Sequence, residues 1–438
     1  MKKKHFCILL SMLMAVILLF GCGSDDSNSN ANESVIETTK DSEETKASGS
    51  VEEKAPVTLT MWVWDDAQVP ATQAMIDEFH DMYPHITVEI TSIAGMADYN
   101  TKMRAVVGTA DAPNVFWINF NLAKEYIPMG FVQGLNEFID RDSGFSKDGL
   151  NASIIETYTV DGTLYGVPKD TDGFAVFYNK SLFDAAAVDY PEDGWTVDDF
   201  VETAKVMTSE GVVGWSNSTS DRVYYNFMYA YGGSPYTEDG LSPNVNSSES
   251  VEGMQVLLDM INDGSAYSRA DLDEMGSGVA FESNLAAMTI DGSWMISEFY
   301  TALGDNLGIV KLPEGPNGIA STGHGIAYAT TTTNPFMEET WLFLSYLGSD
   351  AAQEKQIEVV IPAANGCASI WESVYPDLNL AAFTTALDHN KSYLAVKNAT
   401  AARSAFQEHL ANMQSGMYDN AREAMDAAAK AMKDAIDE

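Results

Sequence analysis

Residues 57–90 read VTLTMWVWDDAQVPATQAMIDEFHDMYPHITVEI and carry the clearest fold signal in the chain. β-Branched and apolar residues fill 57–63, which predicts a strand. The next segment predicts a helix, because its apolar residues recur at intervals of three and four: Met75, Ile76, Phe79 and Met82. Pro84 ends this helix, and residues 86–90 then alternate between apolar and polar as a second strand does. This order indicates an α/β fold with a parallel sheet covered by helices.

The same alternation continues along the chain. Residues 115–118 and 175–178 predict further strands, and residues 196–199 have the pattern of a capping box that opens a helix. Asn334-Pro335 predicts the start of a helix that Gly348 ends. A last helix is predicted by apolar residues that face one way: Phe406, Leu410, Met413 and Met417. More than 380 residues follow residue 55, which exceeds the size of one hydrophobic core, so we expect two lobes.

The first 21 residues predict a signal peptide. Three lysines precede an apolar run over residues 6–20, and this run is shorter than the ~20 residues that span a bilayer. Leu19-Phe20-Gly21-Cys22 resembles the bacterial lipoprotein signal, so we expect Cys22 to carry a lipid; a secretory signal with an incidental cysteine is the alternative. Residues 22–55 contain almost no large apolar residue and predict a disordered tether. The expected location is the outer face of the cytoplasmic membrane of a bacterium, Gram-positive by our interpretation.

Cysteines and charge exclude several classes of protein. Of three cysteines only Cys367 lies beyond the signal and lipid positions, so neither a disulfide nor a cysteine-based metal cluster is expected within one mature chain. The chain has six histidines, and we expect no metal and no cofactor. A net charge of −40 argues against a nucleic-acid partner.

Familiar catalytic motifs are absent from the sequence. It contains no H-E-x-x-H, no G-x-S-x-G, no G-K-[ST] phosphate loop and no G-x-G-x-x-G. We therefore expect no enzyme. A glycosidase needs only two carboxylates beside a cleft, however, and 64 acidic residues offer many such pairs, so a glycan hydrolase stays open as an alternative.

Aromatic residues stand beside carboxylates and amides at the predicted strand ends. These candidate site residues are Trp64, Asp65, Asp66, Asn119, Phe120, Asn121, Trp215, Asp291 and Trp294. Aromatic rings stack on the apolar faces of sugars, and planar polar side chains bond their hydroxyls. Core packing is the alternative for each tryptophan. His324 is a further candidate, because Gly323 and Gly325 allow a close approach of the backbone; a hydrogen-bonded loop histidine is equally expected.

Several short motifs follow one another along the chain. They are Tyr165-Gly166-Val167-Pro168, then Phe177-Tyr178-Asn179-Lys180-Ser181-Leu182-Phe183, then Gly194-Trp195-Thr196, then Phe281-Glu282-Ser283-Asn284-Leu285-Ala286-Ala287-Met288 with Gly292-Ser293-Trp294. In this order, over residues 56 to about 375, the chain resembles family 1 of the extracellular solute-binding proteins, the carbohydrate-binding lipoproteins of ABC importers that include the maltose-binding type.

The resemblance implies a two-lobe fold like that of the periplasmic binding proteins, with hinge crossovers and a ligand cleft between the lobes. The crossovers would lie near residues 165–172, 312–322 and 361–366. Lobe 1 would comprise residues 56–167 and 316–362. Lobe 2 would comprise residues 168–315 and 363–438, including the C-terminal helices.

The resemblance also implies roles for individual residues. Asp172 takes the place of a carboxylate that contacts sugar, and Trp294 that of the stacking aromatic of the second lobe. Residues 119–121 form the polar strand end of the first lobe, where Trp64 and Asp66 line the end of its first strand. Arg222 and Arg403 are additional candidates.

The function implied is that of a binding subunit. It would capture a disaccharide or oligosaccharide outside the cell and deliver it to the transmembrane subunits of an ABC permease, as a monomer and without catalysis. Two alternatives remain: a secreted lipoprotein that hydrolyses glycans, and the same scaffold binding a polyamine or another charged solute.

Overall fold

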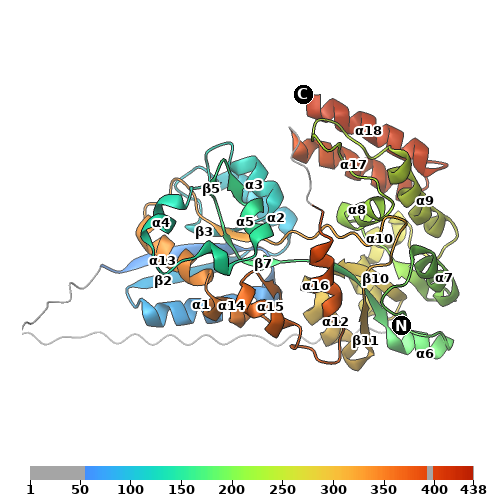
Figure 1. Cartoon of the computed structure of the whole chain (residues 1–438), viewed down its shortest axis with the longest axis horizontal. Coiled ribbons are helices and arrows are strands. Elements are labelled where there is room, and N and C mark those ends of the chain that lie inside the picture. The colour runs from blue at the N-terminus through green and yellow to red at the C-terminus, as the bar shows by residue number, and fades with distance from the viewer. Residues whose placement is uncertain (1–54, 392–397, 438) are drawn as a thin grey trace, which may run out of the picture. The chain divides into compact units, whose positions relative to one another are not determined.

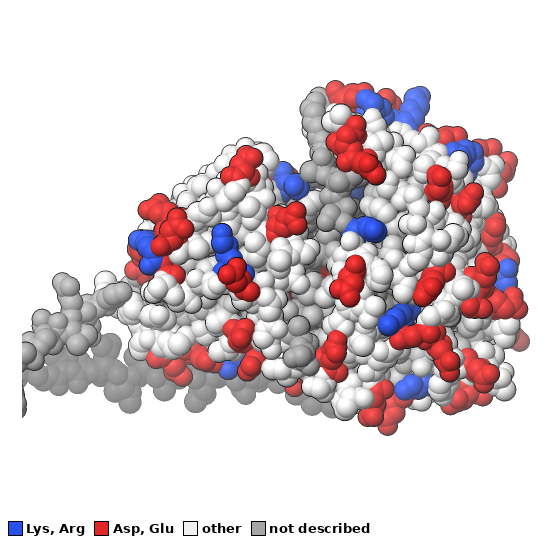
Figure 2. Space-filling model, in the orientation of Figure 1, with Lys and Arg blue, Asp and Glu red and all other residues white. Residues whose placement is uncertain are grey.

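The computed structural model describes residues 55–391 and 398–437, and these form one compact unit. The signal peptide, Cys22 and nearly all of the tether lie outside the described residues. Within the described part of the chain, none of the helices has both the length and the apolar character needed to cross a membrane. Acidic side chains are spread over the face shown in Figure 2, with basic side chains among them.

The first sheet contains the strands predicted near the N-terminus. Its order is β2 (Ile86–Ser92), β1 (Val57–Val63), β3 (Val115–Ile118), β12 (Ala327–Ala329) and β6 (Val167–Pro168). β1 runs parallel to β2 and β3, as predicted. β12 runs antiparallel to β3 and β6, so the sheet is mixed where the sequence predicted a parallel one.

Helices cover both faces of the first sheet (Figure 1). Leu59, Met61 and Val63 of β1 pack on one face with α1 (Val69–Met82) and α13 (Met337–Leu347). Phe116 and Ile118 of β3 pack on the other face. The helices there are α2 (Met96–Val106), α3 (Phe120–Tyr126) and α5 (Ala152–Thr157). Shorter elements complete this part: α4 (Asn136–Arg141), the hairpin of β4 (Thr159–Val160) and β5 (Thr163–Leu164), α14 (Asp350–Gln353) and the 3₁₀ helix η5 (Glu354–Gln356).

The second sheet has the order β11 (Leu307–Val310), β8 (Phe174–Asn179), β10 (Ala286–Gly292) and β9 (Val213–Ser216). β8 is antiparallel to both of its neighbours, whereas β9 is parallel to β10. One face packs on α7 (Val197–Met207), α8 (Asp221–Ala230), α9 (Ser248–Asn262), α17 (Ala399–Gln414) and α18 (Ala421–Asp437). The other face packs on α11 (Ser277–Glu282), α12 (Ile296–Leu303) and α16 (Ala381–Asp388). The remaining helices are α6 (Lys180–Ala186), α10 (Arg269–Met275) and α15 (Asn365–Trp371).

Three connecting segments join the elements of the two sheets. They are residues 169–173 between β6 and β8, residues 311–326 between β11 and β12, and residues 357–380 between η5 and α16. The segments are bonded to one another: β7 (Asp170–Thr171) pairs with β13 (Ile361–Pro362), and the Lys169 amide donates to the Ile326 carbonyl at 2.9 Å.

Helix ends confirm some predictions and correct others. The capping box is present, because Thr196 Oγ1 accepts from the Asp199 amide at 3.1 Å and Asp199 Oδ2 accepts from the Thr196 amide at 2.8 Å. The helix predicted from Asn334 begins at Met337, since Asn334 Oδ1 accepts from the Phe336 amide and closes a turn ahead of the helix. Met417 lies beyond the end of α17 and is exposed, and the predicted last helix is followed by another, α18.

Candidate ligand-binding site

A cavity of about 320 Å³ opens where the strand ends of the first sheet meet the connecting segments and elements of the second sheet. Its lining consists of Trp64, Asp65, Gln68, Met96, Asn119, Phe120, Asn121, Asp170, Thr171, Asp172, Ser220, Arg222, Ser293, Trp294, His324, Gly325, Ile326, Val360 and Arg403.

The first sheet supplies polar groups from two strand ends. β1 and β3 run parallel, so the residues that follow them meet at one edge of the sheet. Asp65 follows β1 and caps a 3₁₀ helix, accepting from the Ala67 amide at 2.9 Å and from Gln68 Nε2 at 2.8 Å. Asn119 follows β3 and caps α3 through its Oδ1, whereas its buried Nδ2 has no hydrogen-bond partner within residues 55–391 and 398–437. That amide nitrogen is an unsatisfied donor in a residue that lines the cavity.

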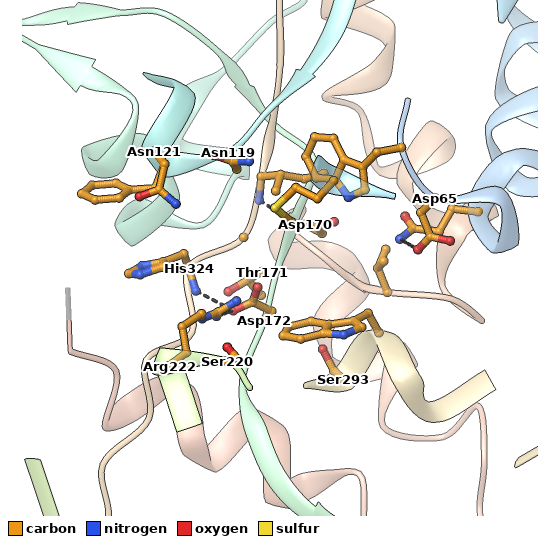
Figure 3. A pocket seen from close by; sticks show the side chains of 18 of the residues that line it. Asp65, Asn119, Asn121, Asp170, Thr171, Asp172, Ser220, Arg222, Ser293 and His324 are labelled. Atoms are coloured by element: carbon orange, nitrogen blue, oxygen red, sulfur yellow. Dashed lines mark hydrogen bonds and ion pairs between the residues drawn. The ribbon is translucent and has the colours of Figure 1, made fainter. Parts of the chain in front are cut away.

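Asp172 lies in the cavity wall beside Arg222 and Thr171 (Figure 3). Its Oδ1 accepts from Arg222 Nη2 at 2.7 Å and from the His324 amide at 2.5 Å. Arg222 is fixed in turn, because its Nε and Nη2 donate to the Thr322 carbonyl at 3.0 and 2.8 Å. These bonds leave Asp172 Oδ2 as an acceptor without a protein partner in the described part of the chain.

Aromatic rings enter the cavity from both sheets. Trp294 stands in the 3₁₀ helix η3 (Ser293–Met295) after β10 and packs edge-on against Phe174 at 5.5 Å between centroids. The Arg222 guanidinium lies 5.3 Å from the Trp294 ring. On the side of the first sheet, Trp64 packs edge-on against Tyr99 and Trp117.

His324 is held in its neutral form. Its ring is stacked on Phe120, with centroids 5.3 Å apart. Burial, with the Arg222 charge as a second cause, lowers the pKa of His324 to about 3. The histidine therefore contributes a ring and a neutral polar edge to the wall, and it carries no charge near neutral pH.

Arg403 belongs to α17 and reaches the wall through a buried ion pair. Its Nε and Nη2 donate to Asp221 at 2.5 and 2.6 Å. The Asp221 side chain is fully buried at the start of α8, so the pair joins two helices and fixes the guanidinium.

The structure adds a charged pair that the sequence interpretation missed. Lys169 is fully buried, and its Nζ donates to Gln68 Oε1 and to Asp170 Oδ2, each at 2.7 Å. Burial raises the pKa of Asp170, and Lys169 opposes this rise. Gln68 and Asp170 line the cavity. The only signal in the sequence is a lysine and an aspartate directly after Gly166-Val167-Pro168.

Three of the candidate residues do not line the cavity. Asp66 is exposed and accepts a hydrogen bond from Ser92. Trp215 is fully buried in the core beside Phe200, because its position in β9 directs it toward the helices. Asp291 lies within β10, three residues before Trp294, and accepts from the Gly292 amide. Its burial raises its pKa to about 6.

The described residues hold no group of three or more histidine, cysteine or acidic side chains placed to bind a metal ion. The candidates that the structure brings together are Trp64, Asp65, Asn119, Phe120, Asn121, Asp172, Arg222, Trp294, His324 and Arg403. Their arrangement offers hydrogen bonds and ring faces to a ligand.

Known proteins are similar to this chain in sequence and in fold. A binding protein of Brucella abortus (strain 2308) is 25% identical over 234 residues, which are 49% of this chain and 54% of that protein. The arabinooligosaccharide-binding protein of Bacillus subtilis (strain 168) is 23% identical over 60% of this chain and 55% of its own length. The chain thus spans about half the length of the first curated relatives that it matches.

Among solved structures, an ABC substrate-binding protein from Listeria monocytogenes in complex with cycloalternan superposes with a TM-score of 0.81. It is 24% identical and covers 86% of this chain and 98% of its own. A maltose-bound protein of T. maritima has a TM-score of 0.74 at 20% identity, covering 86% of this chain and 99% of its own. These likenesses show the two-lobe α/β fold of the periplasmic-type binding proteins.

Residues 74–376 match the family described as bacterial extracellular solute-binding protein. This match covers more than half of the chain. The chain therefore belongs to the bacterial extracellular solute-binding protein family.

Proposed function

We propose that this protein is the substrate-binding subunit of an ABC importer for sugars. It binds an uncharged disaccharide or oligosaccharide in the cavity and delivers it to the transmembrane subunits of a permease. It performs no catalysis. The observation that carries this proposal is the pairing of charges in the cavity wall.

Four of the five charged side chains in the described lining form ion pairs within the protein, and the fifth, Asp65, is hydrogen-bonded to neutral groups. Asp172 is paired with Arg222, and Arg403 with Asp221. Asp170 is paired with Lys169, and Asp65 is bonded to an amide and to Gln68. A charged ligand loses its hydration on entry and needs an uncompensated opposite charge in the wall. The paired wall thus favours an uncharged ligand over a polyamine.

The remaining groups suit sugars. Trp64 and Trp294 present ring faces from different sheets, which can stack on the apolar faces of a sugar. Asn119 Nδ2 is a donor and Asp172 Oδ2 an acceptor for hydroxyls, which both donate and accept. The names of relatives support the same ligand class, since they include proteins that bind arabinooligosaccharides and galactooligosaccharides.

The hydrolase alternative needs a carboxylic acid that can transfer a proton to a bound glycan. Asp170 has a raised pKa, but its Oδ2 accepts from Lys169 Nζ and its Oδ1 accepts from the Ile326 amide at 2.8 Å. Both of its oxygens are thus occupied. We expect a bound oligosaccharide to be recovered intact after incubation with the purified protein.

Binding is proposed to close the two lobes by bending the connecting segments, which join the elements of the two sheets. We place lobe 1 at residues 56–167 and 316–362 and lobe 2 at residues 168–315 and 363–438. Outside the described residues, we propose that Cys22 carries a lipid and that residues 22–55 tether a monomeric binding domain to the outer face of a Gram-positive membrane.

A thermal-unfolding screen tests the proposal. Its neutral arm contains maltotriose, arabinotriose and lactose, and its charged arm contains spermidine and the acidic sugar maltobionate. A ligand at 100 times its dissociation constant adds about 2.7 kcal/mol to the free energy of unfolding. We expect stabilisation in the neutral arm alone. Stabilisation by a charged compound alone would contradict the proposal.

A further inference from the structure

Lys169 has no exposed surface, yet it carries a charge beside the cavity. Its ammonium contacts Gln68 Oε1 and Asp170 Oδ2, and it lies 4.5 Å from the centroid of the Trp117 ring. The backbone at this position is fixed by neighbouring elements, because the Lys169 carbonyl accepts from Gln356 Nε2 of η5 at 2.7 Å and from the Ala363 amide of the third connecting segment at 3.3 Å. The amide of the same residue donates to the Ile326 carbonyl. The ammonium is thus held in one position by the fold.

Asp170 depends on this ammonium. The charged and titratable groups that face Asp170 are Lys169, the carboxylate of Asp172 and the hydroxyls of Tyr158 and Tyr328. Lys169 is the cation of this set, and Asp172 is already paired with Arg222. Without Lys169, an ionised Asp170 would be an uncompensated charge in the wall of the cavity.

Lys169 also orients the neighbouring amide. Because Gln68 Oε1 accepts from the ammonium, Gln68 Nε2 is directed at Asp65 Oδ2 and donates to it at 2.8 Å. A chain of bonds therefore runs from the connecting segment to the carboxylate that follows β1. Lys169 therefore supplies a hydrogen bond to Asp170 directly and to Asp65 through Gln68.

We propose that Lys169 is the residue that keeps the cavity selective for uncharged ligands, by compensating Asp170 and orienting Gln68 toward Asp65. The inference rests on the proposed function, since it concerns the same cavity. Lys169 is buried behind the wall, so it acts through Asp170 and Gln68 as a positioning residue.

The test is the pH dependence of affinity in Lys169→Met. A ligand that fills the cavity removes water from Asp170, and an unpaired carboxylate is then favoured in its protonated form. Binding should take up a proton, so the affinity of the variant for a neutral sugar should fall as pH rises, by as much as tenfold per pH unit. The affinity of the wild type should stay constant between pH 5 and 8.

The probe is whichever of maltotriose, arabinotriose and lactose binds the wild-type chain most tightly, measured by calorimetry. Lys169→Met/Asp170→Asn removes both charges and should show no pH dependence. Lys180→Met removes a lysine from outside the cavity lining and should behave as the wild type does. If Lys169→Met does not fold, Lys169→Gln, which keeps a hydrogen-bond donor without the charge, undergoes the same titration.

A flat pH profile in the Lys169 variant, or an affinity that rises with pH, would overturn this inference while leaving the proposed function intact. Failure of the wild type to bind any of the three sugars would overturn the proposed function and this inference together. A falling profile that the double variant abolishes supports the role of Lys169, because a purely structural defect would persist in the double variant.

Discussion

Charged side chains in the cavity wall are held by partners from other elements of the fold. Arg222 on α8 holds Asp172 of a connecting segment, and Arg403 on α17 holds Asp221 on α8. A largely buried charge is stabilised by such a partner, so these pairs fix the positions of the groups that a ligand meets. At the scale of the residue, the same ion pairs therefore neutralise these charges and hold the wall rigid.

Asp291 is partly buried and forms no ion pair with another described residue. Burial raises its pKa from 3.8 to about 6, so the fold favours the protonated carboxyl. The stability that this preference gives is fully present below pH 3.8 and is lost as pH rises through about 6. Asp291→Asn keeps an oxygen for the Gly292 amide and removes the charge. It should raise the free energy of unfolding at pH 7 by on the order of 3 kcal/mol relative to the wild type.

Chemical denaturation of both proteins at pH 4 and pH 7 measures this difference. The advantage of Asp291→Asn should be large at pH 7 and small at pH 4. An equal difference at the two pH values would show that ionisation of Asp291 is not its cause.

Some site residues could be predicted because their signal is local. Trp294 follows a strand and stands beside Gly292 and Ser293, and Asp65 stands beside Trp64 just after a strand, so each is recognisable from its neighbours. Lys169 gives no such signal. Its burial arises only where its own connecting segment meets the other two, which lie more than 130 residues further along the chain. That information is not contained in any short window of sequence.

At the scale of the element, the connecting segments are unusually close together. Gly323 lies so near to Asp172 that an added Cβ would stand 1.8 Å from the Asp172 carbonyl oxygen. Gly325 has a φ of +81° and a Cβ there would stand 2.1 Å from the Asp170 carbonyl oxygen. The two glycines that flank His324 therefore let one connecting segment lie directly on another, and this contact places the His324 amide against Asp172.

Gly323→Ala should separate these two segments. Overpacking of this kind costs about 1–3 kcal/mol of stability, and it should also weaken ligand binding by displacing Asp172. Gly149→Ala is the control, since nothing lies within 4 Å of the added Cβ. Thermal unfolding and calorimetry on the two variants make the comparison. Equal stability and affinity in both would show that the close approach at Gly323 has no role.

Elements were predictable where periodicity was long and uninterrupted. The bounds of β1 are those predicted, and α1 ends before Pro84 as predicted. The predicted helix start at Asn334 was wrong, because the Asn334 side chain is hydrogen-bonded to Phe336, Thr330 and Thr340. The helix therefore begins later, at Met337. The antiparallel return of β12 also could not be predicted, because its pairing joins strands about 200 residues apart.

At the scale of the whole molecule, the order of the elements and the motifs predicted the two-lobe fold, which the solved structures confirm. The identity of the sugar could not be predicted. It depends on how a few donors, acceptors and rings are spaced around one cavity, and small displacements of these groups decide between sugars that differ only in hydroxyl orientation.

The proposed attachment to the membrane is a property of the whole protein that would depend on one residue. Cys22→Ala should release the protein into the soluble fraction, because it removes the proposed site of lipid attachment. Fractionation after a high-salt wash checks this, with Cys367→Ala as the matched control that should stay bound. Retention of Cys22→Ala on washed membranes would contradict the assignment.

The most direct test of the central claim is a calorimetric titration of residues 55–438 with the neutral sugar that stabilises the protein most. The wild type should bind it, and Trp294→Ala should lose on the order of 1–3 kcal/mol of binding free energy through the lost contact of a buried ring. Phe336→Ala, which removes an exposed ring outside the cavity, should bind as the wild type does. An affinity of Trp294→Ala equal to that of the wild type would contradict the claim that this cavity holds the sugar.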